Sequence, residues 1–507
     1  MKGICKHVMA ALSLLFAVSI LMTSCLNPRV PDKGMMGGLT EDGVGQETVM
    51  HEPNDSILPG DKGWDTDVPC SCVPEMTDPL TTGNEGEPAP DTTETAPQTT
   101  PTDPAGDDLD FSGMEFVFWA PLPEENAYDL FLPEEDSEDI IEAALYQRKL
   151  RIEDKLNLRL VVEYVENAPT SVETILWAVD NVFAVSLLPE NTLYSLLLQG
   201  LMADLLKLPH LDLWGDGFDV TSAKAYQANG AVLAVAGDLT LSRMQETQAI
   251  FYNATQVDAE RMAELVMNGE WTLEQYLTVT KGVVAGNAVR QAEMLYFGSG
   301  NRLVAPDAND DPSAAWDANR IEELVLVLTK AEKPLTDAPQ ADAFFAGDAP
   351  FLTATFGEML KRDVSFACGV LPPPKLDTKQ RYYATTAANP LMITVPFFIT
   401  PTSYEGEATG AVLYEMCAEA EPITAAYRER LANHMQMGAS GIELLDLVCE
   451  AVVWDLGSGS MEQSGILAVA NQILFPRDMK TFSAVADRLE AELADYRQQT
   501  AEAYGER

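Results

Sequence analysis

Cys25 is the side chain whose neighbours point most directly to a chemical reaction. It follows Leu21-Met22-Thr23-Ser24, so two small residues directly precede its thiol. A signal peptidase requires small residues before the bond that it cuts. The cut would leave a cysteine as the first residue, with a thiol that can form a thioether to a lipid. Two or three acyl chains would then hold the chain stably at a membrane, at roughly 0.8 kcal/mol per buried CH2.

The residues before Cys25 have the layout of an export signal. Lys2 and Lys6 are basic, and segment 8–22 is apolar except at two serines. This apolar segment is shorter than the roughly 20 residues of a membrane-spanning helix, so it predicts a signal peptide over residues 1–24. Segment 21–25 resembles the lipobox of bacterial lipoproteins, with Met22 where leucine is commoner. A plain secretory signal with an incidental cysteine is the alternative.

Catalytic motifs are absent from the part of the sequence that we expect to fold, from residue 111 onward. Its two histidines, His210 and His434, have no metal-ligand spacing around them. It contains neither the Gly-x-Ser-x-Gly elbow of a serine hydrolase nor a phosphate-binding Gly-x-x-x-x-Gly-Lys-Ser/Thr loop. Because the chain is so acidic, two carboxylates at the spacing of a glycosidase active site remain an alternative. We expect no enzymatic activity, no metal and no cofactor.

Charge and composition exclude several classes of partner. The chain has 32 basic and 79 acidic residues and a formal net charge of -47, so nucleic acid and anionic headgroups would be repelled. Residues 25–110 are rich in Pro, Thr and acidic residues and poor in aliphatic clusters. We expect a disordered tether there, with an r.m.s. reach of about 50 Å. Its Cys70-Ser71-Cys72 is a single pair without histidine, which we interpret as incidental.

Strand and helix patterns alternate through the rest of the chain. Alternating or continuous apolar runs predict strands at 114–119, 158–165, 182–188, 249–253 and 350–356. Helical periodicity predicts helices at 137–156, 172–179, 191–199, 258–267, 319–331, 406–420, 423–436, 440–454 and 479–501. Thr272 and Gln275 have the spacing of a capping box, with Trp271 and Tyr276 as a staple across it. The alternation predicts an α/β fold around a mainly parallel sheet, with a helix-rich C-terminal part.

Several short segments, in this order, resemble the family 1 extracellular solute-binding proteins of bacterial ABC importers. They span most of residues 111–470 and lie at 146–153, 229–233, 237–240, 250–253, 268–272, 344–349, 369–375 and 452–457. The chain departs from the family pattern at 281–294, which lacks an Asp-rich loop, and at 182–188, which lacks a preceding aspartate and tyrosine. These departures bear on the ligand more than on the fold.

The resemblance implies a two-lobed periplasmic-binding-protein-like fold with a hinge and a cleft between the lobes. Lobe one would comprise residues 111–246 and 391–507, and lobe two residues 247–390. The crossings would lie at 245–251 and 384–391. A ligand that touches both lobes only in the closed state would shift the population toward closure.

Seven side chains are candidates for the ligand site in that cleft: Trp119, Asn191, Asp238, Tyr252, Asn253, Tyr383 and Trp454. Trp119 ends the first strand, and ligands of open α/β sheets sit beyond the carboxyl ends of strands. Its ring could face a sugar, as could the ring of Trp454 at the rim, or both could simply pack. Asn191 and Asp238 could meet ligand hydroxyls or cap local turns. The resemblance puts the other three beside the crossings.

The sequence thus predicts an extracytoplasmic receptor, lipid-anchored at the outer face of the cell membrane. It would capture a small ligand, most simply a carbohydrate, for the transmembrane subunits of an ABC permease. We expect a monomer that touches the membrane through its lipid anchor only and binds no nucleic acid. The alternatives are the same fold binding a peptide or a cationic amine, or a surface lipoprotein with a degenerate cleft.

Overall fold

The computed structural model describes residues 109–122, 131–135, 137–179, 181–307, 311–459 and 479–504. The predicted signal peptide, Cys25, the tether and its cysteine pair lie outside these ranges. No described helix is both long enough and apolar enough to cross a membrane.

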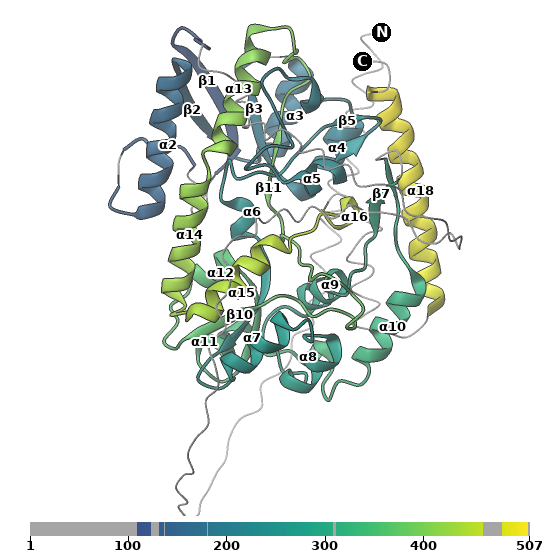
Figure 1. The fold of residues 1–507 in the computed structure, drawn as a ribbon. Helices are drawn as coiled ribbons and strands as arrows, with labels where there is room; N and C mark the ends of the chain where they lie inside the picture. The colour runs from purple at the N-terminus through teal and green to yellow at the C-terminus, as the bar shows by residue number, and fades with distance from the viewer. Residues whose placement is uncertain are drawn as a thin grey trace, which may run out of the picture. The chain divides into compact units, whose positions relative to one another are not determined.

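A four-stranded sheet forms the part of the structure at the top of Figure 1. Its strands, in spatial order, are β11 (Leu391–Thr394), β3 (Val185–Pro189), β1 (Met114–Pro121) and β2 (Leu158–Val165). β1 pairs in parallel with β2 and β3, whereas β11 runs antiparallel to β3. The alternating apolar residues of β1 put Phe116 and Phe118 in the core. Helices α2 (Ile140–Leu156) and α3 (Ala168–Ala178) make the parallel crossovers, so the expected α/β class is confirmed.

A three-stranded sheet lies lower in Figure 1 and is entirely antiparallel. β6 (Gln248–Asn253) lies between β9 (Phe351–Thr355) and β10 (Cys368–Leu371). The expectation of a mainly parallel arrangement is therefore wrong for this sheet. Every residue of β6 and β9 is buried, so neither strand shows the alternation of buried and exposed residues that is typical of an antiparallel sheet with one solvated face.

Helices and short strands surround the two sheets. Around the first are η1 (Glu190–Thr192), α4 (Leu193–Leu198), η2 (Leu205–Lys207), α5 (Val220–Ala225), β4 (Gln227–Ala228), β5 (Ala231–Val232) and α6 (Ser242–Gln245). The chain from β6 to β10 also forms α7 (Ala259–Met267), α8 (Leu273–Thr280), α9 (Ala288–Gly298), β7 (Val304–Pro306), β8 (Pro312–Ala314), α10 (Ala318–Leu328), η3 (Leu335–Asp337), α11 (Ala341–Phe345) and α12 (Phe356–Leu360).

The start of α8 corrects one local prediction. Thr272 is the N-cap residue, but its side chain accepts no helix N–H, so the expected capping box does not form. Instead, the first helical N–H, of Leu273, donates to the carbonyl of Lys375 at 2.7 Å. A backbone carbonyl of a neighbouring segment thus takes the place of a side-chain cap. The rings of Trp271 and Tyr276 meet edge to face with centroids 6.1 Å apart, as the staple requires.

Two chain segments that join the sheets are hydrogen-bonded to each other. The N–H of Gln248 donates to the carbonyl of Thr386 at 3.0 Å, and the N–H of Ala388 donates to the carbonyl of Glu246 at 2.8 Å. These residues lie in or next to the segments 245–251 and 384–391, where the resemblance puts the crossings. The two passages between the sheets therefore lie side by side.

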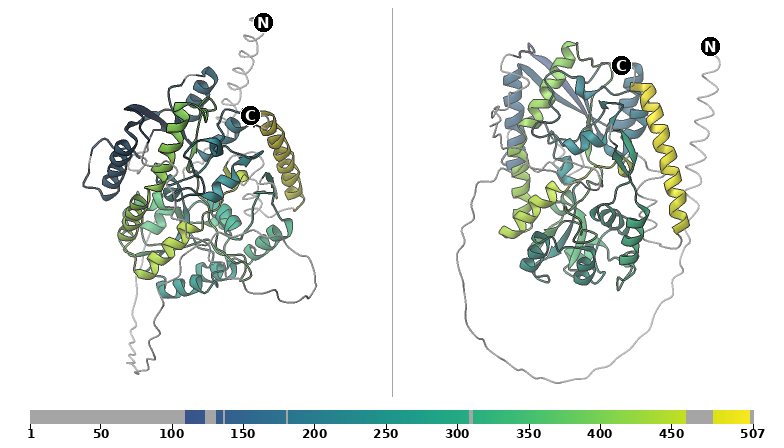
Figure 2. Two further views of the ribbon diagram at one scale, coloured as in Figure 1. Left: turned by 45° about the horizontal axis from the view of Figure 1, so that its top comes forward. Right: turned by 45° about the vertical axis from the view of Figure 1, so that its right-hand side comes forward.

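The C-terminal part is helix-rich, as expected, with α13 (Tyr404–Ala418), α14 (Glu421–His434), α15 (Ala439–Glu450), α16 (Leu456–Gly459) and α18 (Met479–Tyr504). α13 and α14 pack on α2, while α15 packs on α7 and β10. α18 runs along the opposite side and packs on α4, β4 and β8 (Figure 2). These helices therefore contact elements of both sheets.

Candidate functional site

A cavity of about 400 Å³ lies at the carboxyl edge of the parallel strands, and we call it the sheet-edge cavity. Ala120 and Pro121 end β1, and Pro189 ends β3, where all three line this space. Ligands of open α/β sheets bind beyond this edge. A cavity of this size also lies within the range of small-ligand sites, roughly 300–1,000 Å³.

Elements beyond the first sheet supply the other walls of the sheet-edge cavity. Ser242, Gln245 and Glu246 come from α6 and its C-terminal end, and Asn389 precedes β11. From the side of the three-stranded sheet come Thr355 of β9, Gly357 and Glu358 of α12, Lys361 just after it and Arg290 of α9. The cavity is therefore bounded by elements of both sheets, and a bound molecule would touch both.

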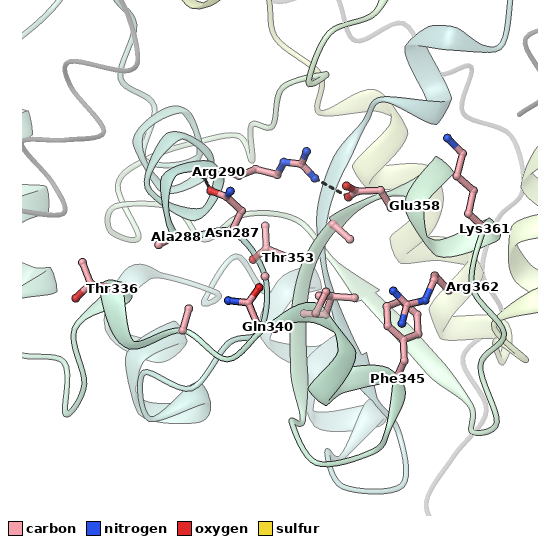
Figure 3. Close-up of a pocket in the computed structure, with 15 residues that line it drawn as sticks. Asn287, Ala288, Arg290, Thr336, Gln340, Phe345, Thr353, Glu358, Lys361 and Arg362 are labelled. Carbon is pink, nitrogen blue, oxygen red and sulfur yellow. Dashed lines mark hydrogen bonds and ion pairs between the residues drawn. The ribbon is translucent and has the colours of Figure 1, made fainter. Parts of the chain in front are cut away.

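A second cavity, of about 580 Å³, adjoins the first, and we call it the α9–α12 cavity (Figure 3). It is lined by the start of α9, by residues around α11, by β9 and by α12 with the two residues after it. Arg290, Glu358 and Lys361 line both cavities. The two spaces thus share a wall.

An ion pair stands in that shared wall. Nη1 of Arg290 donates to Oε2 of Glu358 at 2.5 Å, across the space drawn in Figure 3. Glu358 is also held by its own helix, because Oε2 accepts from the N–H of Thr355 while Thr355 Oγ1 accepts from the N–H of Glu358. This reciprocal arrangement is a capping box. It fixes the carboxylate and, through it, one end of Arg290.

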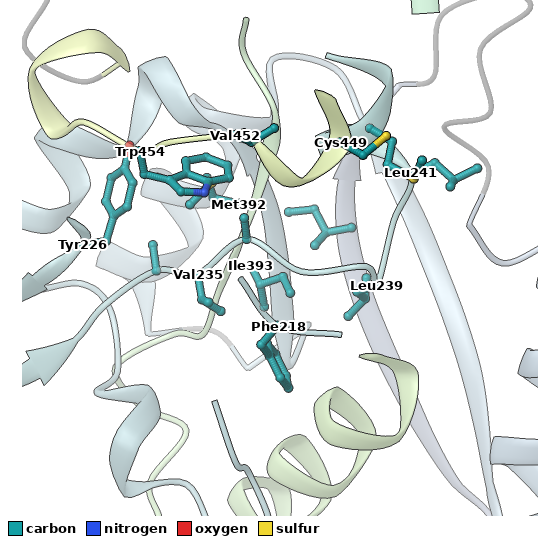
Figure 4. Close-up of a cluster of buried hydrophobic side chains, with 14 of the residues drawn as sticks. Phe218, Tyr226, Val235, Leu239, Leu241, Met392, Ile393, Cys449, Val452 and Trp454 are labelled. Carbon is teal, nitrogen blue, oxygen red and sulfur yellow. The ribbon is translucent and has the colours of Figure 1, made fainter. Parts of the chain in front are cut away.

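Trp119 does not line either cavity. Its ring stacks on Phe183 with centroids 4.7 Å apart, and its Nε1 donates to Glu163 at 2.8 Å. Trp454 is similarly buried, and its Nε1 donates to Asp219 at 2.8 Å. It sits at the end of the apolar cluster in Figure 4, beside Tyr226. Both rings are held by packing and one hydrogen bond.

The two polar candidates of the first sheet lie close to the walls without entering them. The N–H of Asn191 donates to Oδ1 of Asn389, a lining residue of the sheet-edge cavity, at 3.2 Å. Asp238 makes an ion pair with Arg243 at 2.8 Å. Arg243 itself directly follows the lining residue Ser242. Asn191 therefore contacts a lining residue directly, whereas Asp238 pairs with the chain neighbour of one.

The candidates near the crossings are engaged elsewhere. Tyr252 is buried, which raises the pKa of its hydroxyl to about 12. Asn253 accepts from the N–H and hydroxyl of Thr255 and so closes a local turn. The hydroxyl of Tyr383 donates to the carbonyl of Val266 at 3.0 Å, under the ammonium of Lys375. None of the seven predicted residues lines either cavity, and their binding roles stay predictions.

The sequence prediction missed the polar residues that do line the cavities. One signal was available: Thr355 and Glu358 repeat the Thr-x-x-Glu spacing of a capping box at the end of the strand predicted over 350–356. No local pattern marks Arg290 or Asn389, because each reaches the cavity from another element. The described residues include no group of three or more His, Cys, Asp or Glu side chains placed to hold a metal ion.

Comparison with known proteins finds similarity in structure. No protein-family model and no curated protein sequence matches the chain. The ABC substrate-binding protein from Listeria monocytogenes, solved with cycloalternan, aligns with 75% of this chain and 99% of its own at 13% identity and a TM-score of 0.45. The cyclic alpha-maltosyl-1,6-maltose binding protein from Arthrobacter globiformis aligns with 77% of this chain and 99% of its own at 13% identity and a TM-score of 0.48.

An extracellular solute-binding protein of family 1 from Alicyclobacillus acidocaldarius aligns with 76% of this chain and 98% of its own at 10% identity, with a TM-score of 0.45. Each of these alignments covers about three quarters of this chain and nearly the whole of the other protein, with little identity in sequence.

Proposed function

We propose that this protein is a lipid-anchored extracellular receptor that captures a carbohydrate and delivers it to an ABC permease. The observation that carries the proposal is the sheet-edge cavity. It lies at the carboxyl ends of β1 and β3 and is lined by elements of both sheets. A ligand there contacts elements of both sheets. Its binding therefore favours whichever arrangement brings the two walls together.

The chemistry of the lining supports a sugar over a cationic ligand. Ser242, Gln245, Thr355 and Asn389 offer neutral donors and acceptors that suit hydroxyl groups. A cationic amine would require converging carboxylates. The cavity has two, Glu246 and Glu358, but Arg290 and Lys361 balance them, and Glu358 is paired with Arg290. The open volume speaks against a degenerate cleft, which its own side chains would fill.

A thermal-shift screen of the full chain from residue 25, with Ser in place of Cys25, tests the ligand class. The screen covers mono- and oligosaccharides, amines and short peptides. A sugar at 100 times its Kd should raise the free energy of unfolding by about 2.7 kcal/mol. A clear shift with an amine, and none with any sugar, would contradict the carbohydrate assignment.

Asn389→Ala should weaken the binding of the sugar found in that screen. Removing one hydrogen-bonding side chain from the cavity wall costs about 1 kcal/mol, or roughly fivefold in Kd. Gln498→Ala is the control, because Gln498 is an exposed amide of α18 that lines neither cavity. Calorimetric titration measures both variants. Equal Kd values for Asn389→Ala and the unchanged chain would show that the sugar binds elsewhere than in this cavity.

The anchor has its own test in bacterial cells. Labelled palmitate should be incorporated into the wild-type chain and not into Cys25→Ser, and the variant should appear in the medium or the periplasm. Equal labelling of both forms would show that Cys25 is not the modified residue.

A further inference from the structure

The α9–α12 cavity has the opposite charge balance to the chain around it. Arg290, Lys361 and Arg362 line it, and Glu358 is its one acidic lining residue (Figure 3). In the whole sequence, acidic residues outnumber basic ones by 79 to 32. Like charges gathered in a concave, poorly hydrated space focus the field there and attract the opposite charge. This cavity therefore favours an anion on a protein that otherwise repels anions.

The cations are held in ways that a ligand could exchange. Arg362 donates to Asp342 at 2.7 Å, but the Asp342 side chain is 81% exposed, so solvent screens this pair. The Arg362 guanidinium also lies 4.3 Å from the centre of the Phe345 ring, in a cation–π contact with this lining residue. Planar guanidinium groups bind carboxylates and sulfates through two parallel hydrogen bonds, which gives both affinity and orientation.

The remainder of the lining suits the body of a sugar. Phe345 and Leu352 are apolar, whereas Asn287, Gln340 and Thr353 bring neutral donors and acceptors. The volume of about 580 Å³ lies within the range of small-ligand sites. Arg290, Glu358 and Lys361 line both cavities, so an elongated ligand that passes these side chains would contact both spaces.

We propose that the ligand is an acidic saccharide, whose neutral end occupies the sheet-edge cavity and whose carboxylate or sulfate group binds Arg290, Lys361 and Arg362 in the α9–α12 cavity. This inference rests on the proposed function and specifies its ligand class. The ligand anion competes with Glu358 for Arg290. Glu358 stays in place through its bond to the N–H of Thr355.

The test compares matched disaccharides on the full chain from residue 25, with Ser in place of Cys25. Three probes share one neutral sugar at one end and carry glucose, glucuronic acid or sulfated glucose at the other. Calorimetric titration should give a Kd at least tenfold lower for one of the charged probes than for the neutral one. The two charged probes separate carboxylate from sulfate recognition. Raising the salt concentration should reduce the preference.

Arg362→Gln should abolish most of the charged-over-neutral preference while binding of the neutral probe is kept, because Arg362 lines only the α9–α12 cavity. Arg290→Gln should also abolish most of the preference, and, because Arg290 lines both cavities, only the ratio of charged to neutral Kd is compared for this variant. Arg261→Gln is the matched control, since it removes the same charge from the exposed face of α7, where Arg261 pairs with Glu264. Equal affinity for the three probes, or a preference that survives both cavity variants, would overturn the acidic-saccharide proposal alone. Binding of none of these probes nor of any sugar in the wider screen would overturn the carbohydrate function with it.

Discussion

Arg148→Met should lower the free energy of unfolding by about 3 kcal/mol, the largest effect that we expect from a single substitution. Arg148 is completely buried in α2. Its Nη1 donates to the carbonyls of Met416 and Asp238, and its Nη2 to the carbonyl of Leu239, at 2.8–3.2 Å. One guanidinium thus ties α2 both to α13 and to the segment before α6.

The effect is large because the variant leaves three buried or partly buried backbone carbonyls without the hydrogen-bond donor that Arg148 supplies. A buried carbonyl without a donor costs about 1–3 kcal/mol, and Met fills the space without donating. Removing the cation returns part of that cost, because burial of the guanidinium is itself unfavourable and lowers its pKa to about 10. The net loss should lower the melting temperature by about 4 °C.

Thermal and urea unfolding followed by circular dichroism measure this loss. Arg159→Met is the control, because Arg159 lies on the surface of β2 and pairs with the exposed Glu115. Such a pair contributes at most about 1 kcal/mol. The interpretation of Arg148 fails if the two variants unfold at the same temperature and urea concentration. A failure of Arg148→Met alone to accumulate as folded protein would agree with it.

Stability should fall as the pH rises from about 4.5 to about 7.5, an unusual direction for a protein. Acids with raised pKa values cause it. Burial raises the pKa of Glu293 to about 7, and two further acids, Glu190 and Asp455, are buried close to each other. Burial, together with the nearby charge of Asp455, raises the pKa of Glu190 to about 7, although the Tyr226 hydroxyl donates to it at 2.5 Å. Burial also raises the pKa of Asp455 to about 6, against three backbone N–H groups that donate to it.

The sign follows from proton binding in the two states. In the unfolded chain these acids lose their protons near pH 4, whereas in the folded protein they keep them until pH 6–7. Over that window the folded state binds more protons, so stability is highest at the acidic end and declines as pH rises. For Glu190 the decline is on the order of 3 kcal/mol.

Glu190→Gln should remove much of this slope. Glutamine still accepts the hydroxyl of Tyr226, but it does not ionise. Urea unfolding at a series of pH values from 4.5 to 8 measures the slope for the wild type, for Glu190→Gln and for Glu115→Gln, an exposed control on β1. Parallel curves for the wild type and Glu190→Gln would show that Glu190 is not the group responsible.

Local sequence patterns predicted most of the elements. The helix expected at 258–267 is α7, and the strand expected at 158–165 has the observed bounds of β2. The strand expected at 182–188 begins at Val185, because an apolar run does not mark where pairing with β1 starts. The helix expected at 440–454 ends at Glu450, since the next residues pair with Thr385.

The candidate site was much less predictable. The aromatic residues that stood out in the sequence are Trp119 and Trp454. Both are large apolar groups, and burying such a ring in the core stabilises the fold more than leaving it exposed in a cavity. The polar residues around the cavities carry no such mark. Arg290 and Glu358 are 68 residues apart, and only the tertiary fold brings α9 and α12 close enough for this ion pair.

By itself, the sequence determined the alternating elements, the α/β class and the helical C-terminal part. Those features follow from the spacing of apolar residues within one strand or one helix, which acts over a few residues. The tertiary structure alone decided the antiparallel second sheet, the two adjoining cavities and the ion pair between them. A cavity wall is made of residues from several elements, so its composition depends on how those elements pack, and no local spacing encodes that.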